Sequence, residues 1–143
     1  MEFSGIRTRI IDIRPDWDEY FLSICKAVAA RADCRRAKHG CVIVKDHRIV
    51  STGYNGGPSG GPSCLDGKCP RGLLSNEECR SLSSYENCIA IHAEANAIAY
   101  ADHKDTVDAT LYVTGVQCDM CRKLTKAAGI KRVVWPTGTE ELF

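Results

Sequence analysis

The sequence has little excess charge and few aromatic residues, and each shortage argues against certain classes of binding partner. Its 143 residues carry 19 Lys and Arg against 18 Asp and Glu, a net charge of +1. Proteins that bind a long nucleic acid usually show a basic face, and single-strand binders need aromatic stacking surfaces, yet aromatics make up 7% of the chain. We therefore expect no polynucleotide partner. A small anionic ligand is compatible with this composition, because it needs only a few local cations.

Long apolar runs are also missing. No stretch approaches the ~20 residues that a membrane span needs, and Met1–Ile13 contains arginines but no apolar core of a signal peptide. We expect a single cytoplasmic domain that does not contact a membrane. The nine cysteines are unusual in such a chain, and their number is odd. Without an export signal, they indicate metal binding or catalysis rather than a disulfide framework.

Hydrophobic periodicity predicts alternating helices and strands. A helix is expected to start at Asp16, with Glu19 completing a capping-box pattern, and Asp46-His47 has the length of a tight hairpin connection. The other elements are expected as helices over 92–100 and 118–128 and strands over 41–45, 48–52, 109–114 and 130–135. The expected fold class is α/β: a three-layer α/β/α sandwich whose mixed central sheet has an N-terminal hairpin and a parallel C-terminal half.

The strongest chemical signal combines His92 and Glu94 with two cysteines three residues apart, Cys118 and Cys121. Both clusters open predicted helices, so the two sulfurs can face one ion and His92 can add a third ligand. Three protein ligands leave the fourth position of a zinc ion to water, which is the pattern of a catalytic site. Glu94 can then take a proton from that water and pass it on. This combination is the signature of the zinc deaminases of nucleobases.

Two other interpretations explain these residues less well. The cluster could merely pack at the starts of two helices, but four chemically suitable residues at this spacing make that a poor explanation. The zinc could be purely structural, but such a site has no use for a carboxylate beside the metal, so Glu94 argues against it.

The surrounding sequence resembles the cytidine/deoxycytidylate deaminase superfamily, and within it the deoxycytidylate deaminases, over residues 17–135. The matching stretches are 40–46 with Cys34 before them, 51–60 with its Gly-Tyr-Asn-Gly-Gly-Pro run, 91–98 and 110–114. The resemblance implies one deaminase domain over residues 1–143 with the cytidine-deaminase-like fold. It also implies a zinc cofactor, a homohexamer in the cytoplasm, and conversion of dCMP to dUMP and ammonia, which supplies dUMP for thymidylate synthesis.

The resemblance further implies a set of ligand contacts. Substrate contacts are expected from Asn55, from the backbone of Ala93, and from the strand end at Val113 and Thr114. Asn55 could also be a simple turn former. The candidates for the 5′-phosphate are Arg35, Arg36, Lys38 and the serines within Ser81–Ser84, although the three cations could equally form a solvated face. The nucleotides dCTP and dTTP are expected as effectors.

A second, structural zinc is expected from the same resemblance, with Cys34, Cys64, Cys69 and Cys88 near the matching positions. It would staple an insertion at about 54–90, which is too poor in apolar residues to fold by burial alone. Cys79 or His103 could replace one of the four ligands. Alternatively, the loop cysteines could all be ordinary thiols that bind no metal. Cys25 and Cys41 are interpreted as core residues, and His39 as a solvated surface histidine.

One position departs from the family pattern: Gln117 stands where proline usually precedes the first cysteine of the pair. This difference is the one feature that favours a non-catalytic relative that senses dCTP. The chemistry could also act on another cytosine nucleotide, on a free nucleoside or on a polynucleotide, but the neutral charge and few aromatics argue against the last of these.

Overall fold

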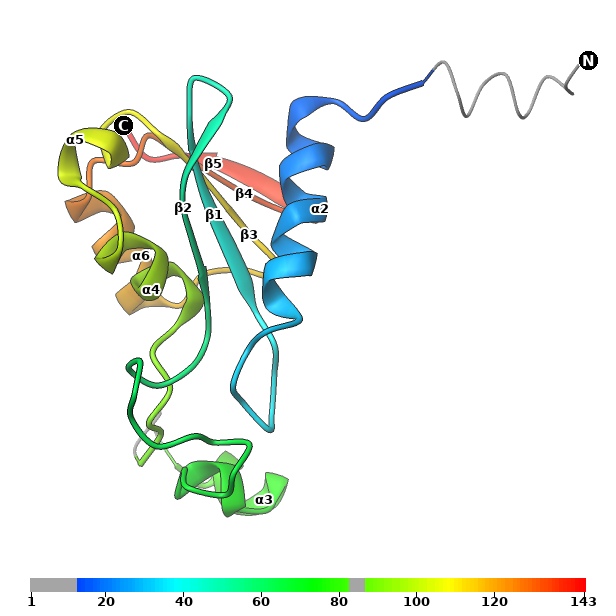
Figure 1. The fold of residues 1–143 in the computed structure, drawn as a ribbon, viewed down its shortest axis with the longest axis vertical. Helices are drawn as coiled ribbons and strands as arrows, with labels where there is room; N and C mark the ends of the chain where they lie inside the picture. The colour runs from blue at the N-terminus through cyan, green and yellow to red at the C-terminus, as the bar shows by residue number, and fades with distance from the viewer. Residues whose placement is uncertain (1–12, 83–86) are drawn as a thin grey trace, which may run out of the picture.

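Residues 13–82 and 87–143 are described by the structure, a computed structural model of the chain. Their strands form one sheet in the order β2-β1-β3-β4-β5. The strands are β1 (Gly40–Lys45), β2 (Arg48–Tyr54), β3 (Thr110–Val113), β4 (Arg132–Trp135) and β5 (Gly138–Glu141). The helices are α2 (Trp17–Ala29), α3 (Asn76–Arg80), α4 (Ala93–Ala99), α5 (His103–Thr106) and α6 (Asp119–Ala127), with a 3-10 turn η1 (Arg71–Leu73). Helix α2 covers one face of the sheet and α4, α5 and α6 cover the other (Figure 1), which confirms the predicted three-layer sandwich.

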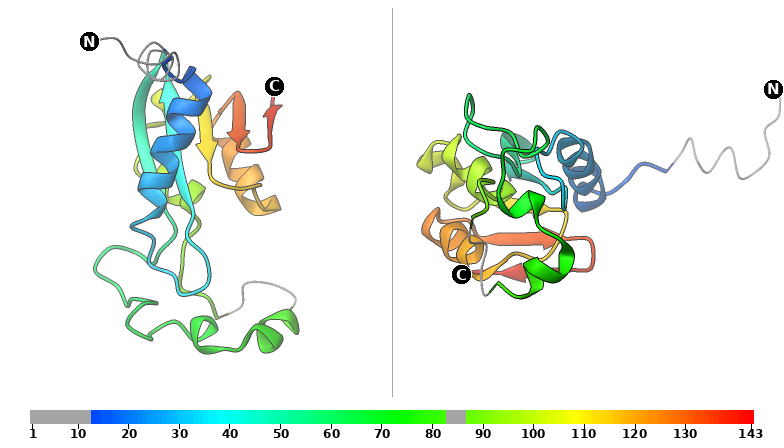
Figure 2. Two further views of the ribbon diagram at one scale, coloured as in Figure 1. Left: turned by 90° about the vertical axis from the view of Figure 1, so that its right-hand side faces the viewer. Right: turned by 90° about the horizontal axis from the view of Figure 1, so that it is seen from below.

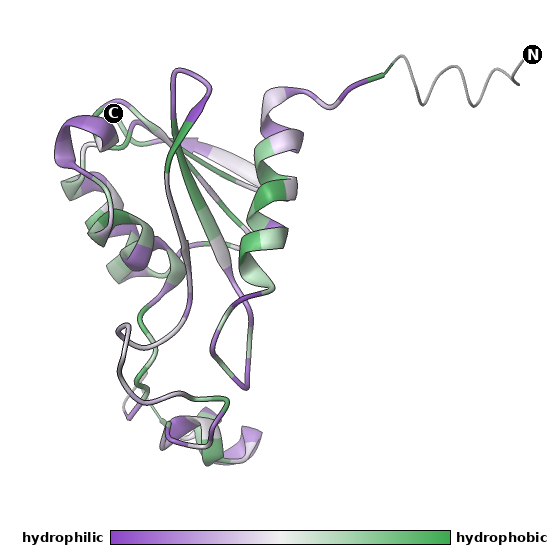
Figure 3. Ribbon diagram, viewed as in Figure 1, coloured by the Kyte–Doolittle hydropathy of each residue, from purple (hydrophilic) through white to green (hydrophobic). Residues whose placement is uncertain are grey.

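Alternation along β1 builds a core on both faces of the sheet. Cys41 and Ile43 belong to the apolar cluster beneath α4, whereas Val42 and Val44 belong to the cluster beneath α2. All four side chains are buried, and Figure 3 shows apolar residues gathered between the layers. Cys25 lies in the second cluster. The interpretation of Cys25 and Cys41 as core residues is therefore confirmed.

The strand pairings follow the predicted mixed pattern. Strands β1 and β2 form an antiparallel hairpin, and its two connecting residues, Asp46 and His47, have φ values of 52° and 61°. These are the left-handed conformations that a tight two-residue hairpin requires. Strand β3 runs parallel to β4, to which α6 connects it. The predicted hairpin and the predicted parallel pair are both present.

Strand β5 was not predicted, and it pairs antiparallel with the outer edge of β4. The parallel C-terminal half therefore consists of β3 and β4 alone. The Gly-Thr-Glu-Glu sequence of β5 lacks the apolar alternation that reveals a half-buried strand. Backbone pairing and a close approach to Trp135 define it instead, because a Cβ on Gly138 would lie 2.9 Å from the Trp135 ring.

The long segment between β2 and α4 lies beyond one end of the sheet, where it contains η1 and α3 (Figures 1 and 2). Helix α3 starts at a capping box in which the Ser75 hydroxyl accepts from the amide of Glu78 and the Glu78 carboxylate accepts from the amide of Ser75, both at 3.1 Å. In the described part of the chain, no helix is long and apolar enough to span a bilayer.

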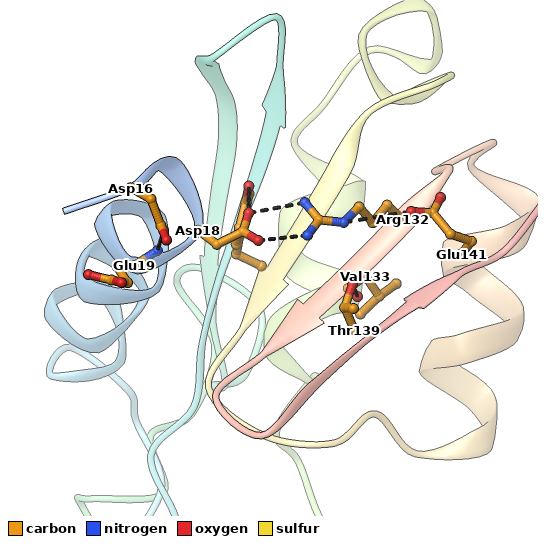
Figure 4. Close-up of polar contacts among 8 residues, drawn as sticks. Asp16, Asp18, Glu19, Arg132, Val133, Thr139 and Glu141 are labelled. Carbon is orange, nitrogen blue, oxygen red and sulfur yellow. Dashed lines mark hydrogen bonds and ion pairs between the residues drawn. The ribbon is translucent and has the colours of Figure 1, made fainter.

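Polar contacts fix α2 against the sheet (Figure 4). The Asp16 side chain caps the helix by accepting from the Glu19 amide at 2.8 Å, which confirms the predicted helix start. Further on, the guanidinium of Arg132 on β4 donates to both carboxylate oxygens of Asp18, at 3.0 and 2.6 Å. The hydroxyl of Tyr112 on β3 donates to the same carboxylate at 2.7 Å. Asp18 thus joins α2 to two strands.

Replacing Asp18 with asparagine is expected to lower the free energy of unfolding by about 1–2 kcal/mol at neutral pH, because a bidentate ion pair is lost at a site that is still partly exposed to solvent. The hydrogen bond from Arg132 lowers the pKa of Asp18 below its ordinary value. The carboxylate therefore stabilises the fold above about pH 4, and this contribution is lost as the pH falls further. Urea unfolding at several pH values measures the difference.

Glu141 provides the control for this change, because its carboxylate lies 3.7 Å from the same Arg132 and its side chain is more exposed. Glu141→Gln should change the free energy of unfolding by less than about 0.5 kcal/mol. A difference between wild type and Asp18→Asn that stays constant from neutral to acidic pH would contradict the assignment to the ionised carboxylate.

Candidate metal centre and pocket

Three candidate zinc ligands meet where α4 and α6 begin. His92 is the N-cap residue of α4, Cys118 is the N-cap residue of α6, and Cys121 lies in the first turn of α6. The Nδ1 atom of His92 lies 3.2 Å from the sulfur of Cys121 and 3.4 Å from the sulfur of Cys118. All three ligand atoms lie within 4.8 Å of one another. The structure thus brings together the three residues that the sequence predicted as ligands.

The spacing and the chemistry of these atoms suit zinc. Tetrahedral zinc with Zn–S bonds of about 2.3 Å and a Zn–N bond of about 2.0 Å separates nitrogen from sulfur by roughly 3.5 Å, close to the two distances from His92 Nδ1 to the cysteine sulfurs. Two thiols and one imidazole are also a donor set that zinc favours. The residues therefore fit the metal, with one coordination position left for a fourth ligand.

A buried carboxylate accompanies the three ligands. Glu94, the second residue of α4, is only 6% exposed. Burial first, and then the charge of Glu94, raise the pKa of the Cys121 thiol. A divalent cation between the two sulfurs would offset the burial and the negative charge that raise this pKa, and would favour the thiolate forms that bind metal.

A glycine in β2 sets the position of α4 and thus of Glu94. A Cβ on Gly53 would lie 2.3 Å from the carbonyl oxygen of Ala93 and 2.4 Å from the amide nitrogen of Ala97. Glycine therefore allows the helix backbone to lie directly on the strand. The Ser51 hydroxyl adds a hydrogen bond of 2.6 Å to the carbonyl of Ala97. Helix α4, with Glu94 in its first turn, is held rigidly against the sheet.

A pocket opens beside these residues and runs toward the insertion. His92, Ala93, Glu94 and Cys118 form one part of its wall. The remaining wall residues are Cys34, Arg36, Ala37, His39, Asn55, Cys64, Cys69, Arg71, Gly72, Cys88, Ala90, Val113, Gly115 and Val116. Glu94 and two of the candidate zinc ligands, His92 and Cys118, therefore line the same pocket.

The predicted substrate residues are close to one another, with different surroundings. Asn55, Ala93 and Val113 line the pocket. Asn55 is also a scaffold residue: its Oδ1 accepts from the His39 amide at 2.7 Å and its Nδ2 donates to the Ala37 carbonyl at 2.9 Å. Thr114 is not a wall residue, but its hydroxyl lies 3.2 Å from Nδ1 of His39. His39 is exposed, as the sequence predicted, and it also lines the pocket.

The structure separates the predicted phosphate candidates. Arg36 reaches the pocket, but its guanidinium donates to the carbonyls of Arg71 and Leu74 and to Oδ1 of Asn76, so it is already engaged in holding the insertion. Arg35 and Lys38 are exposed and are not wall residues. The Ser81 hydroxyl donates to the carbonyl of Glu78, while the other two serines of Ser81–Ser84 lie outside the described residues. Arg71, a wall residue, was not predicted.

Four of the insertion-side cysteines gather along the same pocket wall: Cys34, Cys64, Cys69 and Cys88. The amide of Arg35 donates to the sulfur of Cys64, and that of Arg36 donates to the sulfur of Cys34, both at 3.4 Å. Burial alone would raise the pKa of Cys69, but hydrogen bonds from backbone amides and from the thiols of Cys64 and Cys88 lower it overall. These four residues are called the cysteine quartet below.

The two proposed substitutes for a quartet ligand do not lie with it. Cys79 is a buried residue of α3 whose thiol donates to the carbonyl of Arg71 at 3.8 Å. His103 is exposed at the start of α5, and α5 lies at the opposite end of the molecule from the insertion (Figure 1). The expectation that His103 could complete the site is therefore wrong, because the fold keeps the two regions apart.

Comparisons with known proteins agree with this geometry. Residues 15–137 match the model of the cytidine and deoxycytidylate deaminase zinc-binding region. The deoxycytidylate deaminase of Mycobacterium phage D29 is 50% identical over 127 residues, which cover 86% of this chain and 96% of that protein. The deoxycytidylate deaminase of Schizosaccharomyces pombe is 37% identical, over 87% of this chain and 38% of its own length.

Solved structures show the same likeness. The dCMP deaminase of cyanophage S-TIM5 in complex with dCMP and dUMP has a TM-score of 0.65 and 25% identity, over 86% of this chain and 82% of the other. Its apo form has a TM-score of 0.63. Together with the His-Cys-Cys centre, these matches show that the chain belongs to the cytidine and deoxycytidylate deaminase family and is a zinc-dependent deaminase.

Proposed function

We propose that this protein hydrolyses dCMP and water to dUMP and ammonia. The observation that carries the proposal is the buried carboxylate of Glu94, which shares one pocket wall with His92 and Cys118. The relative from Mycobacterium phage D29 bears the name deoxycytidylate deaminase, and the cyanophage structure holds dCMP and dUMP, which supports the same nucleotide for this chain.

In this mechanism, His92, Cys118 and Cys121 hold zinc, and Glu94 moves protons. When bound, zinc supplies a Lewis acid that lowers the pKa of water to about 7. Glu94 accepts a proton from the attacking water and delivers it to N3 of the pyrimidine as the new C4–O bond forms. It then transfers the second proton of the former water to the exocyclic nitrogen, the C4–N bond breaks, and ammonia leaves.

The other pocket residues orient the nucleotide. We assign the pyrimidine edge to the backbone at Ala93 and at the end of β3, where Val113 lines the pocket. Asn55 contributes through the same wall and also fixes the segment that carries His39. Thr114 acts indirectly, because its hydroxyl contacts the His39 ring. Homo-oligomerisation and the effectors dCTP and dTTP stay predictions of the resemblance.

We also propose a second, structural zinc on the cysteine quartet. Four thiols are the donor set of one class of structural zinc site. Among the described residues, only His92, Cys118 and Cys121 already have three ligand atoms within 4.8 Å of one another, so zinc would have to draw the quartet thiols together. Burial raises the pKa of Cys64 overall, but backbone amides donate to the sulfurs of Cys34 and Cys64, and such hydrogen bonds favour thiolates. On this proposal, residues 1–143 form one deaminase domain whose insertion at about 54–90 is held by metal.

The direct test measures ammonia release by the zinc-loaded protein. We expect turnover of dCMP and much slower turnover of an oligodeoxynucleotide that contains the same base. Faster reaction with the oligonucleotide would replace the proposal with a polynucleotide deaminase. No release from dCMP, from 5-modified dCMP or from deoxycytidine, with a thermal shift on adding dCTP, would replace it with a nucleotide sensor.

A further inference from the structure

Gln117 takes part in a hydrogen-bonded chain that crosses the first turns of α6. Its Nε2 atom lies 2.7 Å from the hydroxyl of Thr125, and that hydroxyl lies 2.7 Å from the carbonyl oxygen of Cys121. Thr125 is completely buried. Gln117 precedes the N-cap residue Cys118, so the chain connects the segment before α6 to the second turn of the helix.

The direction of both hydrogen bonds follows from chemistry. A carbonyl can only accept, so the Thr125 hydroxyl donates its one hydrogen to Cys121. The hydroxyl can then only accept from Gln117, and an amide nitrogen is the donor that glutamine offers. A buried threonine often bonds the carbonyl four residues earlier without a further partner. The hydrogen bond that Gln117 donates to Thr125 is therefore the part of this hydrogen-bonded series that needs an explanation.

The connection spans the segment that carries two candidate zinc ligands. Cys118 and Cys121 lie between Gln117 and Thr125, and they also contact each other through the amide of Cys121, 3.4 Å from the sulfur of Cys118. The residues around them offer little apolar anchoring, because Val116 is 75% and Met120 61% exposed. A polar link into the buried side of α6 can therefore set the spacing of the two sulfurs.

We propose that Gln117 is a positioning residue for the catalytic zinc, acting through Thr125 and the backbone of Cys121. Gln117 is not among the residues that line the pocket, so this role does not require contact with substrate. The inference rests on the proposed function, since it assumes that Cys118 and Cys121 hold the metal. The inference also gives Gln117 a role in an active enzyme, whereas the sequence alone, in which Gln117 replaces the usual proline, favours an inactive relative.

The test combines Gln117→Met, which keeps the length of the side chain without the amide, with Thr125→Val and the double variant. We measure the rate at which zinc passes from the loaded protein to a competing chelator, alongside the decay of dCMP deamination. Each single change is expected to speed release about tenfold. The double variant should be no faster than the faster single variant, because both remove the same link.

Two further variants separate positioning from general stability. Thr106→Val removes a comparable buried hydroxyl on α5, which lies 3.0 Å from the carbonyl oxygen of His103 and 2.7 Å from that of Ala128. Ala128 caps the end of α6 that is remote from Cys118 and Cys121, so zinc release should stay unchanged. Thr125→Ser keeps the hydroxyl and should restore slow release, even where Thr125→Val folds poorly. Unchanged release in Gln117→Met, or multiplied effects in the double variant, would overturn the inference. A wild type without bound zinc or activity would count against the proposed function instead.

Discussion

Glu94→Gln is expected to lower kcat for dCMP deamination by about three orders of magnitude while the zinc content stays at the wild-type value. Glutamine has the size of glutamate but cannot accept and return protons, and a positioned acid–base group contributes about 10²–10⁴-fold to a rate. Removing the carboxylate disables both proton transfers of the proposed mechanism. Steady-state ammonia release and metal analysis of the same sample give the two numbers.

Zinc should be retained because Glu94 is not a ligand in this geometry. His92, Cys118 and Cys121 supply the three donor atoms. The charge of Glu94 also raises the pKa of Cys121, so its removal makes that thiol easier to ionise for metal binding. Glu77→Gln, on the exposed surface of α3, is the control and should leave kcat unchanged. A Glu94→Gln enzyme within tenfold of wild type would contradict the assignment.

The candidate metal centre could be predicted from the sequence because its signals are local. The spacing of Cys118 and Cys121 is that of one helical turn, and the structure places Cys118 and His92 as the N-cap residues of neighbouring helices. Two cysteines that are close in the chain can be recognised as ligands from their spacing alone. Because two thiolates are too few to hold zinc, their chemistry points to the histidine that must supply the third ligand. The hairpin could be predicted for the same reason, because its turn depends only on the two neighbouring residues Asp46 and His47.

The arrangement of the pocket wall could not be predicted from the sequence, because it depends on contacts between residues that are far apart in the chain. His39 is held by Asn55, which lies 16 residues away, and contacts Thr114, 75 residues away. The guanidinium of Arg36 donates to the carbonyl of Arg71, 35 residues away, so Arg36 does not act simply as a phosphate ligand. Such pairings are set by the packing of distant segments rather than by periodicity. The bond from Gln117 to Thr125 is shorter in range, but nothing in the sequence shows which way a glutamine amide points.

Cys69→Ser is expected to reduce the zinc content from two ions per chain to one and to open the insertion to proteolysis. Cys69 is central to the cysteine quartet because hydrogen bonds from the thiols of Cys64 and Cys88 help to lower its pKa. Serine is a poor zinc ligand, and the insertion has few apolar contacts to replace the metal. Tryptic cleavage after Lys68 or Arg80 should become at least about tenfold faster, because the segment then opens locally far more often.

Cys79→Ser provides a matched control within the same insertion. Cys79 is also buried, but its thiol contacts the carbonyl of Arg71 instead of the quartet. This variant should keep two zinc ions and resist trypsin like the wild type. If both variants lost one zinc, Cys79 would have to be a ligand, and if neither did, the quartet would be a group of ordinary thiols. Because four quartet residues line the same pocket as Glu94, loss of their zinc should also raise KM for dCMP, while kcat/KM of the Cys79→Ser control stays at the wild-type value.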